Sequence, residues 1–368
     1  MLQQRGFVEQ LDTPAVVVDL DLLDANLRRT ADLARKSGIK LRPHIKTHKS
    51  IWIAKKQLEY GSVGVTTAKL GEAEVMAAAG IDDILIAYPI VGKKKLERLG
   101  NLMKSAKVTV STDNYEVAKG LSDLGLSLSQ RVALYIDINT GLNRMGKEPG
   151  EESADLIEQI VALPGIEVTG IMTHSGHVYG KSGHDECRAV AQHEAESLVR
   201  TQQLLRERGI EIREVSVGST PTAKFLGEFP GVTEARPGAY VYGDVSQIVT
   251  GTMTREQCAL RIYATVVGKP RANTVVIDAG SKTLTTDVNP ASPGYGILVD
   301  YPGVILERLS EEHGNLRVPD GVELEIGQVV EIIPNHCCTV VNLHDQLTAV
   351  SQGTIADPIR VDARGKIT

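Results

Sequence analysis

Short apolar segments alternate with longer amphipathic segments along the first two thirds of the chain. The apolar segments predict buried strands, and the amphipathic ones predict helices. The predicted strands are 39–44, 62–66, 84–87, 107–111, 132–138, 166–172, 212–217 and 232–235. The predicted helices are 22–37 (with Asp21 as its N-cap), 70–79, 93–103, 114–124, 154–163 and 185–208. This α/β alternation favours a closed (β/α)8 TIM-type barrel over a doubly wound open sheet.

The pattern changes after about residue 244, where no long amphipathic segment separates the apolar ones. The strands predicted there, between Gly, Pro and Asp turns, are 261–267, 274–278, 303–308, 328–333 and 339–343. Such a run predicts a mostly antiparallel β domain. We therefore expect a barrel over residues 15–244 and a β domain over residues 245–368. Residues 1–14 are expected to add a strand to that β domain.

Composition and charge narrow the possible partners and compartments. The 368 residues are 42% hydrophobic but only 4% aromatic, which fits the aliphatic core of a parallel α/β protein. The net charge is −6 and no Lys/Arg stripe occurs, so we expect no nucleic-acid partner. No 18-residue apolar run, signal peptide or disulfide framework is visible. The sequence therefore predicts a soluble cytoplasmic protein without a membrane partner.

Polar side chains at the carboxyl ends of the predicted barrel strands are candidates for chemistry, because barrel active sites lie there. Lys46 follows the first strand, where partial burial would lower its pKa and make it a nucleophile. Arg144 could bind an anionic oxygen, and either His174 or His177 could be an acid/base. Solvated turns and a structural histidine are the alternative interpretations.

Two further segments follow the last two predicted strands, the usual phosphate-binding position of a barrel. Their backbone N–H groups and hydroxyls could hold a phosphate. The segments contribute Gly218, Ser219, Thr220, Gly238, Ala239 and Tyr240. The chain has neither a P-loop nor a GxGxxG motif, so neither nucleotide-binding fingerprint is indicated.

His336 and Cys338 form a candidate metal pair in the predicted β domain. On a strand, residues two apart share a face, so the two side chains could hold one cation. Two protein ligands leave the other coordination positions to water or substrate, as in a catalytic site. The alternative is a buried strand in which Cys337 and Cys338 act as small hydrophobic residues.

Together these motifs resemble a known family. Arg42-Pro43-His44-x-Lys46-x-His48-Lys49, Gly218-Ser219-Thr220-Pro221 and His336-x-Cys338 resemble the D-threonine aldolase and eukaryotic-type D-serine dehydratase family. This family belongs to the fold-type III pyridoxal-phosphate enzymes, whose best-known members are the alanine racemases. The resemblance extends from Leu11 to about Asp345.

The resemblance implies a role for each candidate residue. It implies that Lys46 forms the Schiff base with pyridoxal phosphate and that Arg144 faces the phenolate oxygen of the cofactor. The six residues after the last two strands match the phosphate cradle. His336 and Cys338 match the ligands of a divalent metal, and His174 matches an acid/base. A D-amino acid substrate and a homodimer are also implied.

The resemblance further implies a lyase that acts on 3-hydroxy D-amino acids. Family aldolases typically have Asp at the second metal position, whereas the dehydratases have Cys. Cys338 therefore favours dehydration of D-serine or D-threonine to a 2-oxo acid and ammonia, with zinc preferred over manganese or magnesium. Retro-aldol cleavage to glycine and an aldehyde is the alternative. An amino-acid racemase, which would need a second base such as Tyr295 or Tyr301, and a non-catalytic pyridoxal-phosphate protein are less favoured.

Overall fold

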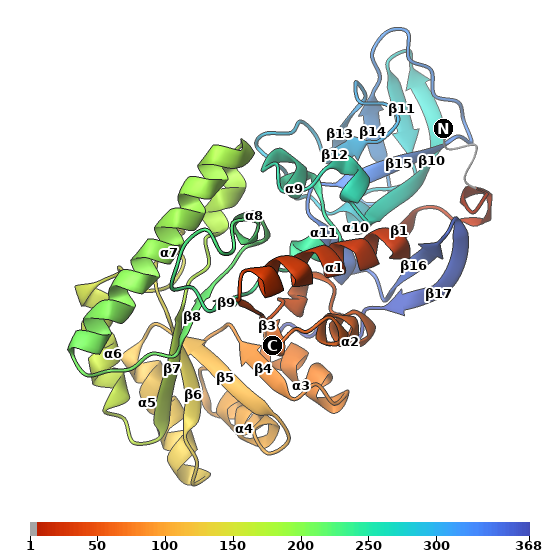
Figure 1. The fold of residues 1–368 in the computed structure, drawn as a ribbon. Helices are drawn as coiled ribbons and strands as arrows, with labels where there is room; N and C mark the ends of the chain where they lie inside the picture. The colour runs from red at the N-terminus through yellow and green to blue at the C-terminus, as the bar shows by residue number, and fades with distance from the viewer. Residues whose placement is uncertain (1–5) are drawn as a thin grey trace.

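The computed structural model describes residues 6–368, so the first five residues assigned to the β domain lie outside the described part. The described chain forms an eight-stranded parallel sheet surrounded by helices and a nine-stranded, mostly antiparallel sheet beside it (Figure 1). The predicted fold class, a TIM-type barrel followed by an antiparallel β domain, is confirmed.

The parallel sheet closes into a barrel. Its strands are β2 (Lys40–Leu41), β3 (Val65–Thr67), β4 (Asp83–Ile86), β5 (Lys107–Thr112), β6 (Val132–Asp137), β7 (Ile166–Met172), β8 (Glu214–Val217) and β9 (Glu234–Ala235). They follow the order β2-β9-β8-β7-β6-β5-β4-β3. A parallel bridge between His44 and Thr66 joins the two ends of this order, and the Thr66 N–H donates to the Pro43 carbonyl at 2.8 Å.

Helices alternate with the barrel strands, as predicted, and the first of them precedes β2. They are α1 (Leu20–Lys36), α2 (Ile51–Glu59), α3 (Leu70–Ala78), α4 (Lys93–Leu102), α5 (Tyr115–Ser127), α6 (Glu151–Val161), α7 (Gly183–Glu207) and α8 (Thr220–Ala223). The predicted N-cap Asp21 is wrong. Asp19 caps α1 instead, because its extended backbone lets Oδ1 accept from the N–H groups of Asp21 and Leu22, both at 3.0 Å.

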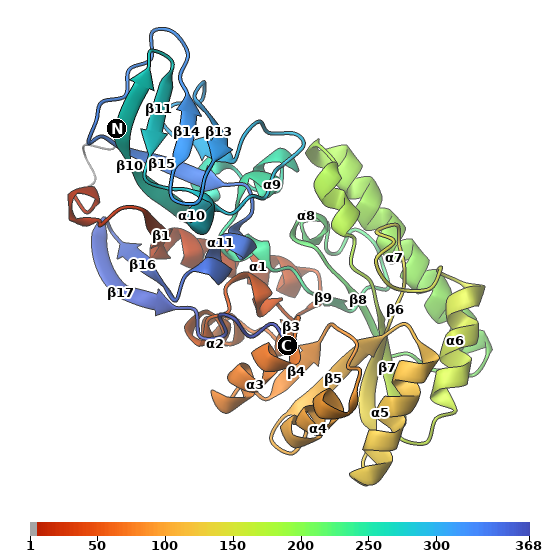
Figure 2. The same cartoon turned by 180° about the vertical axis from the view of Figure 1, so that it is seen from behind.

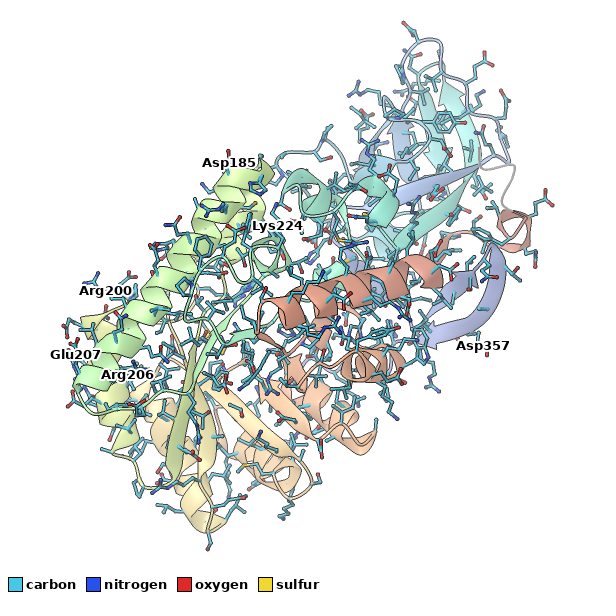
Figure 3. All side chains as sticks on the ribbon, in the orientation of Figure 1. Asp185, Arg200, Arg206, Glu207, Lys224 and Asp357 are labelled. Atoms are coloured by element: carbon cyan, nitrogen blue, oxygen red, sulfur yellow. The ribbon has the colours of Figure 1, made fainter. Side chains whose placement is uncertain are left out.

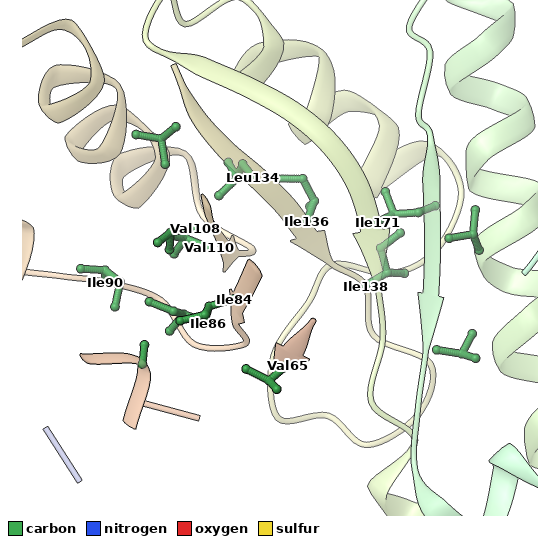
Figure 4. Packing of buried hydrophobic residues seen from close by; sticks show 14 of the residues in the cluster. Val65, Ile84, Ile86, Ile90, Val108, Val110, Leu134, Ile136, Ile138 and Ile171 are labelled. Atoms are coloured by element: carbon green, nitrogen blue, oxygen red, sulfur yellow. The ribbon is translucent and has the colours of Figure 1, made fainter. Parts of the chain in front are cut away.

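The barrel core is aliphatic, as the low aromatic content predicts. Figure 4 shows side chains from successive strands packed against one another, among them Val65, Ile84, Ile86, Val108, Val110, Leu134, Ile136, Ile138 and Ile171. Each of these side chains is at most 5% exposed. Full burial of one such side chain contributes about 1.5–3 kcal/mol, so this packing is the main support for the strand ends that carry the candidate site.

The second sheet contains a closed antiparallel barrel. Its nine strands are β1 (Ala15–Asp19), β10 (Leu260–Arg271), β11 (Thr274–Ile277), β12 (Gly296–Leu298), β13 (Ile305–Leu309), β14 (Gly314–Arg317), β15 (Val329–Pro334), β16 (Gln346–Ser351) and β17 (Thr354–Arg360). Because β10 pairs with both β11 and β15, six strands close on themselves. β1 lies between β10 and β16, so the N-terminal contribution comes from residues 15–19, slightly later than expected.

Three short helices accompany this sheet: α9 (Val245–Val249), α10 (Ser281–Leu284) and α11 (Cys337–Leu343). The strand predicted at 339–343 is wrong, because α11 occupies that segment. Its buried residues Cys337, Val340 and Val341 are spaced i, i+3, i+4, the spacing of one helix face. Tertiary packing of this face outweighs the strand preference of the β-branched residues.

The segment after β17 returns to the barrel (Figure 2). The Ala363 N–H donates to the Lys49 carbonyl at 3.0 Å, and Asp362 Oδ2 accepts from the Ile51 N–H at 2.8 Å. These bonds attach the β domain to the start of α2, directly after the Lys46 segment. Within residues 6–368, no helix is long and apolar enough to cross a membrane.

Candidate active site

Lys46 lies in a short 3-10 turn (Ile45–Thr47) directly after β2. The turn begins at His44, whose ring Nδ1 accepts from the Lys46 N–H at 3.5 Å. Burial is the main cause that lowers the pKa of Lys46, and the positive charge of Arg144 lowers it further, while Cys338 opposes this shift. The lowered pKa increases the fraction of neutral, nucleophilic amine near neutral pH.

Arg144 lies in the loop after β6, which Asn139 organises. Asn139 Oδ1 accepts from the N–H groups of Gly141 at 3.1 Å and Asn143 at 3.0 Å. The Arg144 side chain is exposed, yet its charge lowers the pKa values of both Lys46 and His174. Lys46, Arg144 and His174 therefore lie close enough to interact electrostatically.

His174 follows β7 and is fixed by the neighbouring strand end. Its Nδ1–H donates to the Gly218 carbonyl at 2.7 Å. Burial, followed by the charge of Lys46, lowers the pKa of His174 to about 3. The ring is therefore neutral at physiological pH, and its bonded Nδ1–H leaves Nε2 as a proton acceptor.

The predicted phosphate-cradle residues meet where β8 and β9 end. Ser219 caps α8, and its Oγ accepts from the Thr222 N–H at 3.3 Å. Thr220 Oγ1 accepts from the Tyr240 N–H at 3.2 Å, which ties the two predicted segments together. A Cβ atom at Gly238 would lie 2.7 Å from Thr47 Oγ1. Only glycine therefore lets this segment approach the Lys46 turn so closely.

Tyr240 takes part in the cradle through its backbone, whereas its side chain is buried elsewhere. Its hydroxyl oxygen accepts from Gln57 Nε2 at 2.9 Å, and Gln57 Oε1 lies 3.3 Å from His48 Nε2. This chain of hydrogen bonds connects the cradle to His48, two residues after Lys46. Ala239 and Tyr240 lie in a short 3-10 turn (Ala239–Val241) for which Gly238 is the N-cap.

His336 and Cys338 are brought together, but not by a strand. His336 is the N-cap of α11 and Cys338 lies in the first turn of that helix. The Cys338 thiolate raises the pKa of His336 to about 10. A hydrogen bond from Cys337 and the charge of His336 lower the pKa of Cys338. These opposite shifts favour an imidazolium beside a thiolate, and a metal ion could take the place of the imidazolium proton.

Asp287 orients the candidate metal pair, and no local sequence pattern predicts it. Its Oδ2 accepts from His336 Nδ1–H at 2.7 Å and from Thr339 Oγ1 at 2.8 Å. This bond leaves His336 Nε2 free to ligate, as in carboxylate–histidine–metal arrangements. Among residues 6–368, no group of three or more His, Cys, Asp and Glu side chains could hold a metal. An ion on His336 and Cys338 would keep open positions.

The Lys46 turn and α11 lie against each other, although they are far apart in sequence. Cys338 Sγ lies 3.2 Å from Thr47 Oγ1, and Lys49 Nζ donates to Asn342 Oδ1 at 2.8 Å. The candidate base and the candidate metal pair therefore belong to one site between the barrel and the β domain.

Comparisons with known proteins identify the family. Residues 18–246 match the family model "Alanine racemase, N-terminal domain", and residues 259–350 match "Putative serine dehydratase domain". The chain is 32% identical to D-threonine aldolase of Arthrobacter sp. over 359 residues, 97% of this chain and 93% of the relative. It is also 32% identical to D-threo-3-hydroxyaspartate dehydratase of Delftia sp. strain HT23 over 348 residues, 89% and 91% of the two chains.

Solved structures share the whole architecture. D-threonine aldolase from Filomicrobium marinum superposes with a TM-score of 0.89 at 32% identity, covering 97% of both chains. A cysteine-to-alanine variant of D-threo-3-hydroxyaspartate dehydratase, solved in its metal-free form, has a TM-score of 0.88 at 30% identity, with 96% and 98% coverage.

The fold and these matches define a fold-type III pyridoxal-phosphate enzyme. Within that class, the chain belongs to the family of D-threonine aldolases and D-serine dehydratases, lyases that act on D-amino acids.

Proposed function

We propose that the protein is a pyridoxal-phosphate- and metal-dependent dehydratase that converts D-serine, D-threonine or a related 3-hydroxy D-amino acid into a 2-oxo acid and ammonia. The contact between Cys338 and Thr47, next to Lys46, carries this proposal. It supports the proposal because the candidate base Lys46 then lies beside the candidate metal ligands His336 and Cys338. Elimination of water needs both, a base for the Cα proton and a Lewis acid for the leaving hydroxyl.

The residues present fit both groups. Lys46 offers a buried amine of lowered pKa. The predicted cradle residues offer N–H groups and hydroxyls for a phosphate, except for the Tyr240 N–H, which already donates to Thr220 Oγ1. His336 and Cys338 offer an imidazole nitrogen and a thiolate, a donor set that suits zinc better than manganese or magnesium. When bound, pyridoxal phosphate supplies an electron sink at Cα and the metal ion supplies Lewis acidity.

Three side chains of this protein have assigned tasks in the proposal. Lys46 would hold the cofactor through its amine, and the same amine would serve as the base for the Cα proton. Arg144 would donate hydrogen bonds to the cofactor's phenolate oxygen. His174 stays neutral, because burial and Lys46 lower its pKa to about 3, so it acts as an acceptor and not as a cation.

Aldol cleavage is the second candidate reaction, and the neutral ring of His174 is the observation that favours it. An acceptor at Nε2 can take the proton of the β-hydroxyl, after which the Cα–Cβ bond breaks and yields glycine and an aldehyde. The similarity to D-threonine aldolase supports this candidate equally well.

Product analysis separates the two reactions. We expect purified protein, loaded with pyridoxal phosphate and zinc, to form pyruvate from D-serine and 2-oxobutyrate from D-threonine, with one ammonia per oxo acid. The L-enantiomers serve as controls and should stay unreacted. Glycine and acetaldehyde from D-threonine, without any oxo acid, would establish the aldolase instead.

We further propose that the protein is a cytoplasmic homodimer. The four cysteines are free, which supports a reducing compartment. The homodimer rests on the family resemblance, and light scattering tests it. We expect a mass of about twice that of the 39.7 kDa chain, and a monomeric mass at micromolar concentration would contradict the proposal.

A further inference from the structure

Glu194 is a buried carboxyl group on α7 that the proposed chemistry does not use. The outer side of α7 carries exposed charged residues, among them Asp185, Arg200, Arg206 and Glu207 (Figure 3). Glu194 instead faces inward and is 2% exposed. A carboxyl group at such a position needs hydrogen-bond partners, because its desolvation is otherwise costly.

The partners of Glu194 lead to the phosphate cradle. Ser175 Oγ donates to Glu194 Oε2 at 2.5 Å, and the Thr222 hydroxyl also hydrogen-bonds to Glu194. Thr222 Oγ1 in turn lies 2.9 Å from Ser219 Oγ. An unbroken chain of side chains therefore runs from Glu194 through Thr222 to Ser219, one of the residues assigned to the phosphate.

Each hydroxyl in this chain has one proton to donate. The direction of the hydrogen bonds along the chain therefore depends on whether Glu194 is protonated. A protonated Glu194 can donate to Thr222, which then donates to Ser219, and the Ser219 hydroxyl is free to donate to a phosphate. An ionised Glu194 accepts from Thr222, because a carboxylate is a stronger acceptor than the Ser219 carbonyl, which Thr222 Oγ1 also faces at 3.4 Å. In that case Ser219 donates back to Thr222. Ser219 then has no proton left for the phosphate.

The surroundings of Glu194 allow both states near neutral pH. Burial raises the pKa of Glu194 to about 7, whereas the hydrogen bonds from Ser175 and Thr222 and the charge of Arg236 act in the opposite direction. Arg236 is itself buried and donates to Ser216 Oγ and to the Thr173 carbonyl, both at 2.5 Å. Ser175 precedes a 3-10 turn (Gly176–Gly180), Thr222 lies on α8, and Arg236 follows β9.

We propose that Glu194 is a positioning residue of the phosphate cradle, which directs the Thr222 and Ser219 hydroxyls toward a bound phosphate only when its carboxyl group is protonated. This inference rests on the proposed function, because it takes Ser219 as a phosphate ligand. Cofactor binding is then coupled to uptake of a proton by Glu194. Above the pKa of the free protein, the affinity for the phosphate falls as the pH rises.

Pyridoxine 5′-phosphate is the probe for this coupling, because it carries the same phosphate but no aldehyde that could react with Lys46. Its dissociation constant is measured by calorimetry on the cofactor-free chain, for the parent protein and for Glu194→Gln. The amide of Gln can donate to Thr222 and accept from Ser175, so it imitates protonated Glu at every pH. Titration of the probe itself cancels in the ratio of the two constants.

We expect that ratio, parent over Glu194→Gln, to be near one at about pH 6 and to reach roughly tenfold at about pH 8, one unit above the pKa of about 7. At the higher pH the parent protein should take up nearly one proton per bound probe, as measured in buffers of different ionisation enthalpy. Glu194→Gln should take up correspondingly less.

Two further variants complete the test. Glu196→Gln, an exposed position on the same helix, should behave like the parent protein. Thr222→Val interrupts the chain of hydroxyls, so the pH dependence should vanish there as well, which keeps the test valid should Glu194→Gln fail to fold. A ratio of dissociation constants that does not change with pH, together with tight probe binding, would overturn only the proposed role of Glu194. No probe binding by any variant at either pH would overturn the cradle itself and with it the proposed function.

Discussion

Replacing Lys46 by Ala should abolish the Schiff-base absorbance of the resting protein and lower the rate of oxo-acid formation by at least about 10²–10⁴-fold, the usual contribution of a general base. The structural reason is that Lys46 combines burial with a lowered pKa beside Cys338 and Arg144. The absorption spectrum and the rate with D-serine are measured on the same preparation. The two effects should appear together, because one amine serves both steps.

Lys55→Ala is the matched control for this variant. Lys55 is an exposed lysine on α2, nine residues after Lys46, and should leave the spectrum and the rate unchanged. Lys46→Arg keeps a positive side chain but cannot form the Schiff base, so it should resemble Lys46→Ala. A normal spectrum in Lys46→Ala would remove this residue from its proposed role.

Replacing Cys338 by Ala should remove the bound metal and most of the dehydration activity. One of only two protein ligands is lost, and the neighbouring His336 loses the thiolate that raises its pKa to about 10. The loss of metal affinity should exceed the roughly 10- to 100-fold that is typical for losing an outer-sphere partner. Metal content after dialysis and the rate with added zinc are the measurements.

Asp287→Asn is the comparison variant with a smaller expected effect, because Asp287 hydrogen-bonds to His336 and is not one of the two proposed ligands. We expect its metal affinity to fall by about 10- to 100-fold, with activity restored at high zinc concentration. Cys187→Ala, a buried cysteine on α7, should retain the metal. Full activity of the parent protein after exhaustive chelation would contradict a metal-dependent reaction.

The alternation of strands and helices could be predicted from the sequence because each element buries a regular set of aliphatic residues. The segment 337–343 contains a wrongly predicted strand, because Thr339, Val340 and Val341 favour a strand locally. Its helical i, i+3, i+4 spacing of buried residues was present but short, and only packing against the β domain decides between the two states.

The site was predictable where its residues follow strand ends, and hidden where distant segments meet. Lys46, Arg144 and His174 each lie in the segment that follows an apolar strand, so their positions could be inferred locally. Asp287 lies 49 residues before His336 in a turn-rich segment, and no local pattern marks it. Glu194 looks like any charged residue of an amphipathic helix, and only the fold shows that it faces inward.

The contact between Thr47 and Cys338 joins residues 291 positions apart. Asp362 and Ala363, which bind the backbone just after the Lys46 turn, lie still further along the chain. During synthesis, the barrel strands leave the ribosome long before these partners exist. On the proposed roles, a nascent barrel would carry Lys46 without the candidate metal pair and without the segment that secures the turn. We therefore expect a chain that ends before Cys338 to lack catalytic activity, even though its barrel strands are complete.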